Sequence, residues 1–240
     1  MPSLGFDCQP LTEILDIIPK LQGLISLGLK ISCLSSNKYD SNFYTKLKNA
    51  FKSLEHLKEL KMELICLGNF ELWDHLTEVF QNLSSLESFS LLLEPEFDIP
   101  NTNVKKNSVN FLKALLSFQN LRTFSLWLGD KKLGFTQFDI QNQDFLDLCR
   151  IICQLQKLEN LCITLNTRTK VLDTAIPEIL MDFVKLRKLN KLHLRFLQDD
   201  FLFGFKEYRD YKLDYVLLRL MHFDDIVIQK GPINVQSRRE

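Results

Sequence analysis

The chain has 240 residues, 45% of them hydrophobic and 25% charged, so it is long and apolar enough to bury a substantial core. Thirty Lys and Arg balance thirty Asp and Glu, which excludes a global attraction to nucleic acid or to an anionic membrane. The first twenty residues lack the basic start of a secretory signal, and no apolar run approaches the length of a membrane span. We therefore expect an intracellular, cytoplasmic protein, with organelle or cytoskeletal association left open.

One apolar pattern, LxxLxLxL, recurs along the chain. Its versions are "LISLGLKI" (24–31), "LKELKMEL" (57–64), "LESFSLLL" (86–93), "LRTFSLWL" (121–128), "LENLCITL" (158–165), "LNKLHLRF" (189–196) and, more weakly, "LDYVLLRL" (213–220). The last five residues of each unit alternate between apolar and other side chains, which is the period of a strand with one buried face. Each unit therefore predicts one short strand.

Segments of helical period precede most of these units. They are "LTEILDIIPKL" (11–21), "NFYTKLKNAFKSL" (42–54), "LWDHLTEVFQNL" (72–83), "VNFLKALLSFQNL" (109–121), "QDFLDLCRIICQL" (143–155) and "IPEILMDFVKLRKL" (176–189). In the third segment Leu76, Val79 and Phe80 share one side of the predicted helix. Phe70 and Trp73, near its start, are interpreted as helix packing. The predicted order is helix, turn, strand and loop, repeated.

A strand, a crossover helix and the next strand make parallel neighbours, and stacking this unit gives a solenoid. On these motifs the chain resembles leucine-rich-repeat proteins, in particular the ribonuclease-inhibitor-like branch with full helices. The resemblance implies an α/β horseshoe with parallel strands on the concave face and helices on the convex face. We expect a single domain over 1–240, with about seven repeats in 10–221 and a C-terminal cap or tail at 222–240.

Two features depart from the family pattern. Successive units are 33, 29, 35, 37, 31 and 24 residues apart, mostly longer than the roughly 20–29 residues of these repeats. The position after each strand, usually Asn or Cys in the family, holds Ser32, Ile65, Glu94, Gly129, Asn166, Leu197 and Met221. We therefore expect an irregular horseshoe whose turns satisfy their backbone groups without an Asn ladder. An all-helical solenoid of HEAT type is the competing fold, and the alternating strand pattern argues against it.

The sequence holds no recognisable catalytic or metal-binding motif. Glycine-rich phosphate loops, GxSxG and HExxH are absent, and the four histidines are scattered. The six cysteines form no CxxC pair, although Cys149 and Cys153 would share a helix face. Acidic pairs such as Asp199–Asp200 lack the spacing of a calcium loop. We expect no enzymatic activity, no cofactor, no metal and no small-molecule substrate.

Side chains between the apolar strand positions point away from the core and form two columns across neighbouring repeats. The serine column is Gly28, Lys61, Ser90, Ser125, Cys162, His193 and Leu217; the tryptophan column is Lys30, Glu63, Leu92, Trp127, Thr164, Arg195 and Arg219. Leu92 and Trp127 are thus predicted neighbours on an exposed surface. They have Ser90 and Ser125 beside them, Lys61 and Glu63 on one flank, and His193 and Arg195 on the other. An apolar centre with a polar rim is typical of a protein interface.

Trp127 has two other interpretations. The loop 129–143, with Phe135 and Phe138, could cover it, or it could be an isolated exposed aromatic residue. The long loops 94–107 and 129–143 are further candidate contact segments, although tolerated insertions explain such loops equally well.

Our leading hypothesis is a non-enzymatic scaffold that binds a protein partner through the concave strands and long loops, with a place as a subunit of a larger assembly left open. The alternative is a regulator or inhibitor of an enzyme, because relatives of this repeat family regulate nucleases or GTPases. Nucleic-acid binding through Lys191, His193, Arg195 and Arg219 is a weaker third hypothesis, because the net charge is zero. No membrane contact is expected.

Overall fold

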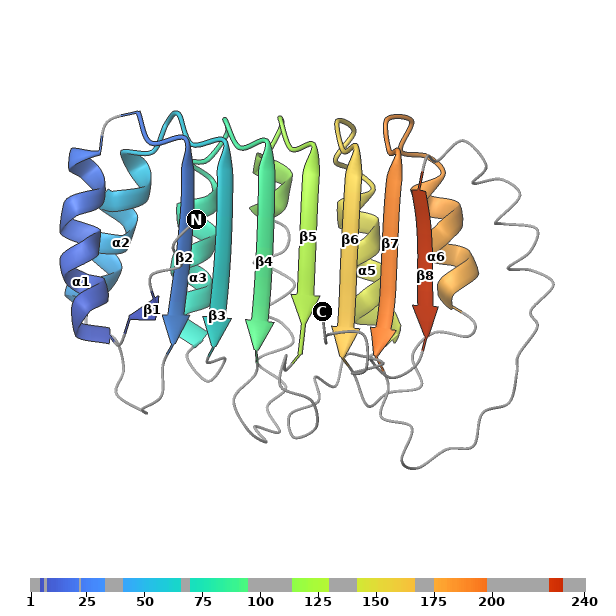
Figure 1. Ribbon diagram of the computed structural model, residues 1–240, viewed down its shortest axis with the longest axis horizontal. Helices are drawn as coiled ribbons and strands as arrows, with labels where there is room; N and C mark the ends of the chain where they lie inside the picture. Colours follow the sequence, from blue (N-terminus) through green and yellow to red (C-terminus); the bar gives the residue numbers. More distant parts are fainter. Residues whose placement is uncertain are drawn as a thin grey trace, which may run out of the picture.

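A computed structural model describes residues 5–6, 8–21, 23–32, 41–65, 70–94, 114–129, 142–166, 175–197 and 225–230. Within these residues, eight strands lie side by side in chain order and form one parallel sheet (Figure 1). The strands are β1 (Gly5–Phe6), β2 (Ser26–Ser32), β3 (Glu59–Ile65), β4 (Ser88–Glu94), β5 (Thr123–Leu128), β6 (Asn160–Asn166), β7 (Lys191–Leu197) and β8 (Asp225–Lys230).

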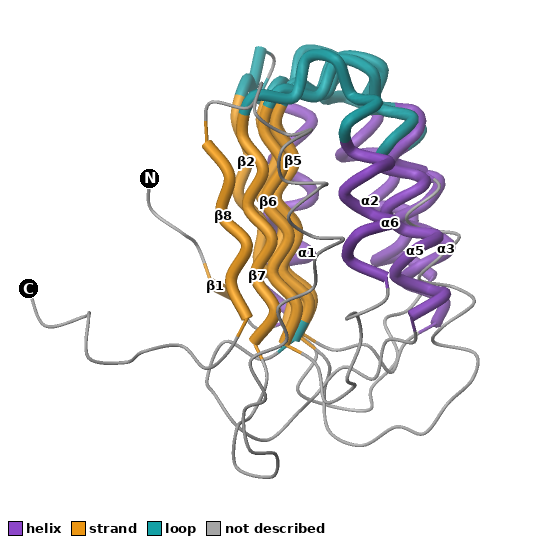
Figure 2. The backbone as a smooth tube through the Cα atoms, turned by 90° about the vertical axis from the view of Figure 1, so that its right-hand side faces the viewer, coloured by secondary structure: helices purple, strands orange, loops and turns teal. Residues whose placement is uncertain are grey.

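The helices lie on one side of this sheet, so the described chain has a strand layer and a helix layer (Figure 2). The α-helices are α1 (Cys8–Ile17), α2 (Ser41–Lys52), α3 (Phe70–Phe80), α5 (Asn142–Ile152) and α6 (Ala175–Phe183). Two short 3₁₀ turns are η1 (Ile18–Lys20) and η2 (Ala114–Ser117). An α/β fold with one open parallel sheet is consistent with the repeat pattern. We call the side of the sheet opposite the helices the helix-free face.

Period-two alternation in each repeat produces the strands at the predicted places. In β5, Phe124, Leu126 and Leu128 are buried while Thr123, Ser125 and Trp127 are half-buried. Each of the first six predicted strands falls within an observed strand, from β2 to β7. One side of each of these six strands therefore packs under the helices, and the other faces away from them.

Each helix leads into its strand through two consecutive turns with the same spacing. In the second repeat the Leu54 N–H donates to the Phe51 carbonyl at 3.1 Å, and the Leu57 N–H donates to the Leu54 carbonyl at 3.0 Å. The equivalent pairs recur in the other repeats, including Leu83 with Phe80 and Leu186 with Phe183. Apolar residues three apart thus turn the chain toward the core after every helix.

A second backbone pattern joins neighbouring repeats where the strands begin. The Ile25 carbonyl accepts from the N–H groups of Lys58 and Glu59 at 2.9 and 3.0 Å, and the Lys58 carbonyl accepts from those of Glu87 and Ser88 at 2.8 and 2.9 Å. The same double acceptance continues at the Glu87, Arg122 and Glu159 carbonyls. At these turns the backbone N–H groups that precede each strand are satisfied by a carbonyl of the neighbouring repeat.

The core lies between the sheet and the helices and is rich in phenylalanine. Phe80, Phe89, Phe118 and Phe124 are almost completely buried and come from four segments of the middle repeats. Phe89 packs edge-on to Phe80 and Phe118 with ring centroids 5.1 and 5.5 Å apart, and it stacks on Phe124 at 5.9 Å. This cluster packs against β4 and β5 on their helix side. These two strands carry Leu92 and Trp127.

The first repeat exposes positions that the later repeats bury. Leu21 is 46% exposed, whereas the equivalent Leu54, Leu83 and Leu186 are 3%, 1% and 0% exposed. In a stacked array each repeat is covered by the one before it, and among the described strands only the two-residue β1 precedes β2. The N-terminal edge of the core is therefore partly open.

Two of the observed strands are not predicted from the sequence, and one predicted helix differs from the structure. The strand beside β7 is β8, which lies in the predicted tail; the weak unit 213–220 lies outside the described residues. The β8 segment "DIVIQK" has the period of a strand but lacks the leading LxxL. The repeat pattern therefore does not predict it. Of the predicted helix at 109–121, the structure describes residues 114–121 and finds η2 there, a single short turn. The two-residue β1 was not predicted.

Candidate protein-binding face

The strand register aligns the two outward columns as the repeats predict. Leu92 pairs with Trp127 across β4 and β5, and Ser90 pairs with Ser125. On the other side Cys162 pairs with His193, and Thr164 with Arg195. Across β7 and β8 the partners of His193 and Arg195 are Val227 and Gln229. The predicted last members, Leu217 and Arg219, lie outside the described residues.

Leu92 is less exposed than the sequence predicts. Its exposure is only 6%, although it does not belong to the hydrophobic cluster that the other buried side chains form with the helices. It lies on the helix-free face, between Glu63 on β3 and Trp127 on β5. Larger side chains on adjacent strands, about 5 Å away, shield a leucine between them. The prediction that Leu92 is an exposed surface residue is therefore wrong, and Trp127 is half-buried.

Thr164 is the next member of the column, and the sequence does not single it out. It is 2% exposed and is the one polar residue that is fully buried in the part of the chain with assigned burial. Its register neighbours, Trp127 and Arg195, both carry much larger side chains. Their sizes in the aligned column are the signal that could have predicted its burial.

Two hydrogen-bond donors beside Thr164 have no acceptor. Trp127 Nε1 and Arg195 Nε are both shielded from solvent and make no hydrogen bond. Buried polar groups in proteins are normally paired, and leaving one unpaired costs about 1–3 kcal/mol. In the isolated chain this part of the face therefore has two hydrogen-bond donors that lack an acceptor.

The flank toward β2 is electrostatically satisfied. Glu63 Oε2 lies 3.7 Å from Lys30 Nζ, and Glu63 Oε1 lies 3.5 Å from Lys61 Nζ. The Glu63 carboxylate thus lies between two lysines on the same face. Exposed ion pairs of this kind contribute about 0–1 kcal/mol each to stability. Here they also place a carboxylate next to both lysine charges.

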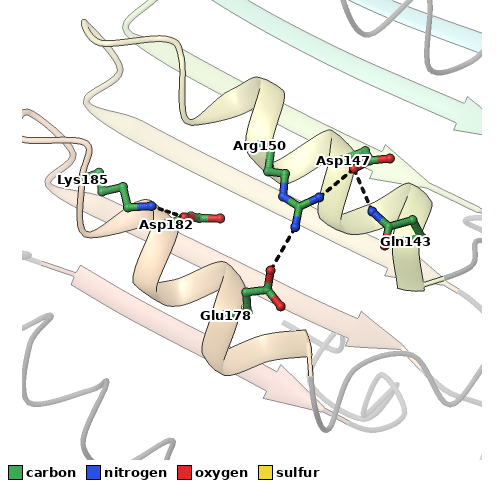
Figure 3. Close-up of polar contacts among 6 residues, drawn as sticks. All are labelled: Gln143, Asp147, Arg150, Glu178, Asp182 and Lys185. Atoms are coloured by element: carbon green, nitrogen blue, oxygen red, sulfur yellow. Dashed lines mark hydrogen bonds and ion pairs between the residues drawn. The ribbon is translucent and has the colours of Figure 1, made fainter.

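The helix layer presents a different surface, with ion pairs that join neighbouring helices. On α5, Arg150 Nη1 lies 3.0 Å from Asp147 Oδ1, and its Nη2 reaches Glu178 Oε1 of α6 at 3.1 Å (Figure 3). Gln143 donates to Asp147 at 2.9 Å, and Lys185 pairs with Asp182. The hydrogen bond to Asp147 is the largest cause that raises the pKa of Arg150. These charged groups have partners within the helix layer.

Cys149 on α5 and Cys153, which follows the end of that helix, provide no reactive group. Burial raises the pKa of the Cys149 thiol well above its ordinary value and that of Cys153 to about 12. Thiols in this state are protonated at neutral pH and are poor nucleophiles and metal ligands. Within the described segments no group of three or more His, Cys, Asp or Glu side chains comes together as a metal site.

Some candidate contact segments cannot be placed. Of the loops 94–107 and 129–143, residues 95–107 and 130–141 lie outside the described part of the chain. This includes Phe135 and Phe138, which were considered as a cover for Trp127. Among the helices that are described, none has the length and apolar character to span a bilayer.

Comparisons with known proteins add little to this description. No protein-family model matches the chain, and no curated protein matches its sequence. One solved structure with similarity is the tropomodulin C-terminal domain of Caenorhabditis elegans, at a TM-score of 0.44 and 11% identity, covering 88% of this chain and 98% of that one. A TM-score this low does not establish a common fold. The fold assignment therefore rests on the parallel sheet and the repeated unit of the chain itself.

Proposed function

We propose that the protein is a non-enzymatic leucine-rich-repeat module of the ribonuclease-inhibitor-like kind, an irregular horseshoe that binds a protein partner through its helix-free face. The observation that carries the proposal is the pairing of Leu92 with Trp127 on the face that no described helix covers. A half-buried tryptophan beside a leucine, flanked by serines and charged residues, has the composition of an interface centre and its rim.

Repeat architecture supports this role in a second way. A sheet of stacked repeats presents a broad surface on which each strand contributes one residue to each column. The phenylalanine cluster behind β4 and β5 holds these two strands in place. A preformed surface loses little conformational entropy on association, which favours binding. We infer an intracellular scaffold or complex subunit, and the intracellular location stays a prediction.

Affinity capture with matched variants tests the proposal. Tagged protein carrying Trp127→Ala or Leu92→Ala is compared with the unmodified chain in native extracts. The control is Met181→Ala, because Met181 is an apolar residue on α6 that is 41% exposed. Partners that bind the helix-free face are expected to be lost from the first two variants and retained by the control. Equal recovery with all four proteins would show that this face is not the binding site.

A regulator of an enzyme would bind that enzyme as its protein partner through the same face. No separate observation favours this alternative. Nucleic-acid binding would need several unpaired basic groups along one line. Of the residues predicted for it, Lys191, His193 and Arg195 lie on β7 alone, and Arg219 lies outside the described residues. Protein binding is therefore the function that the described face supports best.

A further inference from the structure

Trp127, Thr164 and Arg195 are consecutive in the tryptophan column and form one site on β5, β6 and β7. We propose that this site binds a side-chain carboxylate of an acidic peptide segment, held between the Trp127 indole N–H and the Arg195 guanidinium above Thr164. The inference rests on the proposed function, because it specifies the chemistry of the partner at the helix-free face.

The first argument is the lack of acceptors. Trp127 Nε1 and Arg195 Nε are shielded donors without a hydrogen bond. Indole has only a donor, and guanidinium has donors and no acceptor, so neither group can satisfy the other. Thr164 between them has a hydroxyl that can accept, but neither donor bonds it in the structure. A ligand oxygen would supply the missing acceptor. Small rotations of the half-buried indole and guanidinium would turn these donors toward such an oxygen.

The second argument is geometry. Adjacent strands are about 5 Å apart, so Trp127 and Arg195 are separated by about 10 Å with Thr164 between them. Thr164 is small and already 98% covered, since its exposure is 2%. Because Thr164 and both donors are already covered, a carboxylate reaches the two donors only once the Trp127 and Arg195 side chains rotate outward. The planar fork of arginine matches the two oxygens of a carboxylate.

The third argument is charge. Among the described members of the two columns, the fully charged side chains are Lys30, Lys61, Arg195 and a single acid, Glu63. Glu63 lies on β3, four strands from Arg195, and it pairs with both lysines. No described residue forms an ion pair with Arg195. Within these two columns the balance is therefore positive, and Arg195 is the charge without a described ion-pair partner.

The fourth argument separates a peptide from nucleic acid. Arg195, which has no described ion-pair partner, lies in the same column as Leu92 and Trp127. A phosphate backbone needs repeated cationic contacts, whereas a peptide combines apolar and acidic side chains within a few residues. Trp127, which is half-buried beside the buried Leu92, would contact an apolar residue of the peptide, and the site at Thr164 its neighbouring Asp or Glu.

A random peptide display library provides the test. The full chain, Arg195→Gln and Arg187→Gln are screened in parallel; Arg187 is an exposed arginine in the turn before β7 and serves as the matched control. We expect the unmodified chain and the control to enrich peptides that carry Asp or Glu beside an apolar residue, and Arg195→Gln not to. Circular dichroism verifies that each variant is folded.

One enriched peptide is then synthesised with its acidic residue and with the matching amide, and both are titrated against each protein. Arg195→Gln and the amide peptide should each weaken binding roughly 10–100-fold, and together no more than either alone. Trp127→Phe, which keeps the ring and removes the N–H, should weaken binding of the acidic peptide several-fold. Independent effects of Arg195→Gln and the amide would overturn the proposed contact.

Three other outcomes also decide the matter. Enriched peptides that depend on Leu92 and Trp127 but carry no acidic bias would overturn the carboxylate site and leave the protein-binding face intact. Peptides insensitive to Leu92→Ala and Trp127→Ala would overturn both proposals. A single-stranded RNA oligomer that displaces the acidic peptide and binds more tightly, with a steep salt dependence, would assign the site to nucleic acid instead.

Discussion

Two leucines at the same repeat position are expected to respond very differently to truncation. Leu83 follows α3 and is 1% exposed, whereas Leu21 follows η1 and is 46% exposed. Both make the same backbone turn, so they differ chiefly in what covers the side chain. Leu83→Ala removes a buried side chain and leaves a cavity, which costs about 3–5 kcal/mol.

Leu21→Ala removes a side chain that is only about half covered. Full burial of a leucine contributes about 1.5–3 kcal/mol, so half burial contributes about 1 kcal/mol. No closed cavity forms at an open edge. Leu83→Ala should therefore destabilise the protein by about 2–4 kcal/mol more than Leu21→Ala.

Urea unfolding followed by far-ultraviolet circular dichroism measures both values. The slope of each transition must be compared as well as the midpoint, because repeat arrays can lose repeats separately. Equal destabilisation by the two substitutions would refute the open N-terminal edge. It would mean that Leu21 is covered in solution, by another part of the chain or by a second copy.

Three further predictions concern single groups. Trp127→Phe should leave the free protein equally stable or stabilise it by up to about 1 kcal/mol, since it removes an unpaired buried N–H; a loss of more than about 2 kcal/mol in urea unfolding would contradict this. Because burial raises the pKa of Cys153 to about 12, its alkylation at about pH 8 should be slower than in the unfolded chain by about three orders of magnitude; mass spectrometry of iodoacetamide-treated protein measures this, and equal rates would exclude burial. The Lys48 hydrogen bond lowers the pKa of Glu78, so the stabilisation from this pair is present above the unfolded carboxyl pKa and lost as the pH falls through the lower folded value. Glu78→Gln should therefore destabilise by at most about 1 kcal/mol at pH 7 and by nothing measurable near pH 2, and a constant difference between the two pH values would disprove the pairing.

The repeat spacing predicts most of the sheet because each unit carries the same signal. Leu57, Leu60, Met62 and Leu64 place β3 by their period, and the copies in other repeats fix the register through stacking. The segment 225–230 escapes this reasoning. It has only the strand period of Ile226 and Ile228, without the preceding LxxL that marks the other units.

The sequence predicts which residues lie together in the candidate site, but it does not predict how exposed their side chains are. Column alignment places Leu92 beside Trp127 and Thr164 beside Arg195. Whether a member is covered depends on the sizes and rotamers of its neighbours, which a repeat pattern does not specify. The burial of Leu92 and Thr164, and the unpaired indole N–H, therefore emerge only from the three-dimensional arrangement.

The most direct test of binding through the helix-free face is photo-crosslinking from two positions. A photoreactive phenylalanine replaces Ser125, which lies in β5 next to Trp127, or Gln81, which is exposed at the end of α3 in the helix layer. Crosslinked products in native extracts are then identified by mass spectrometry. Binding through the helix-free face predicts a specific protein adduct from position 125 that position 81 does not give. An adduct from position 81 with none from position 125 would contradict the proposal.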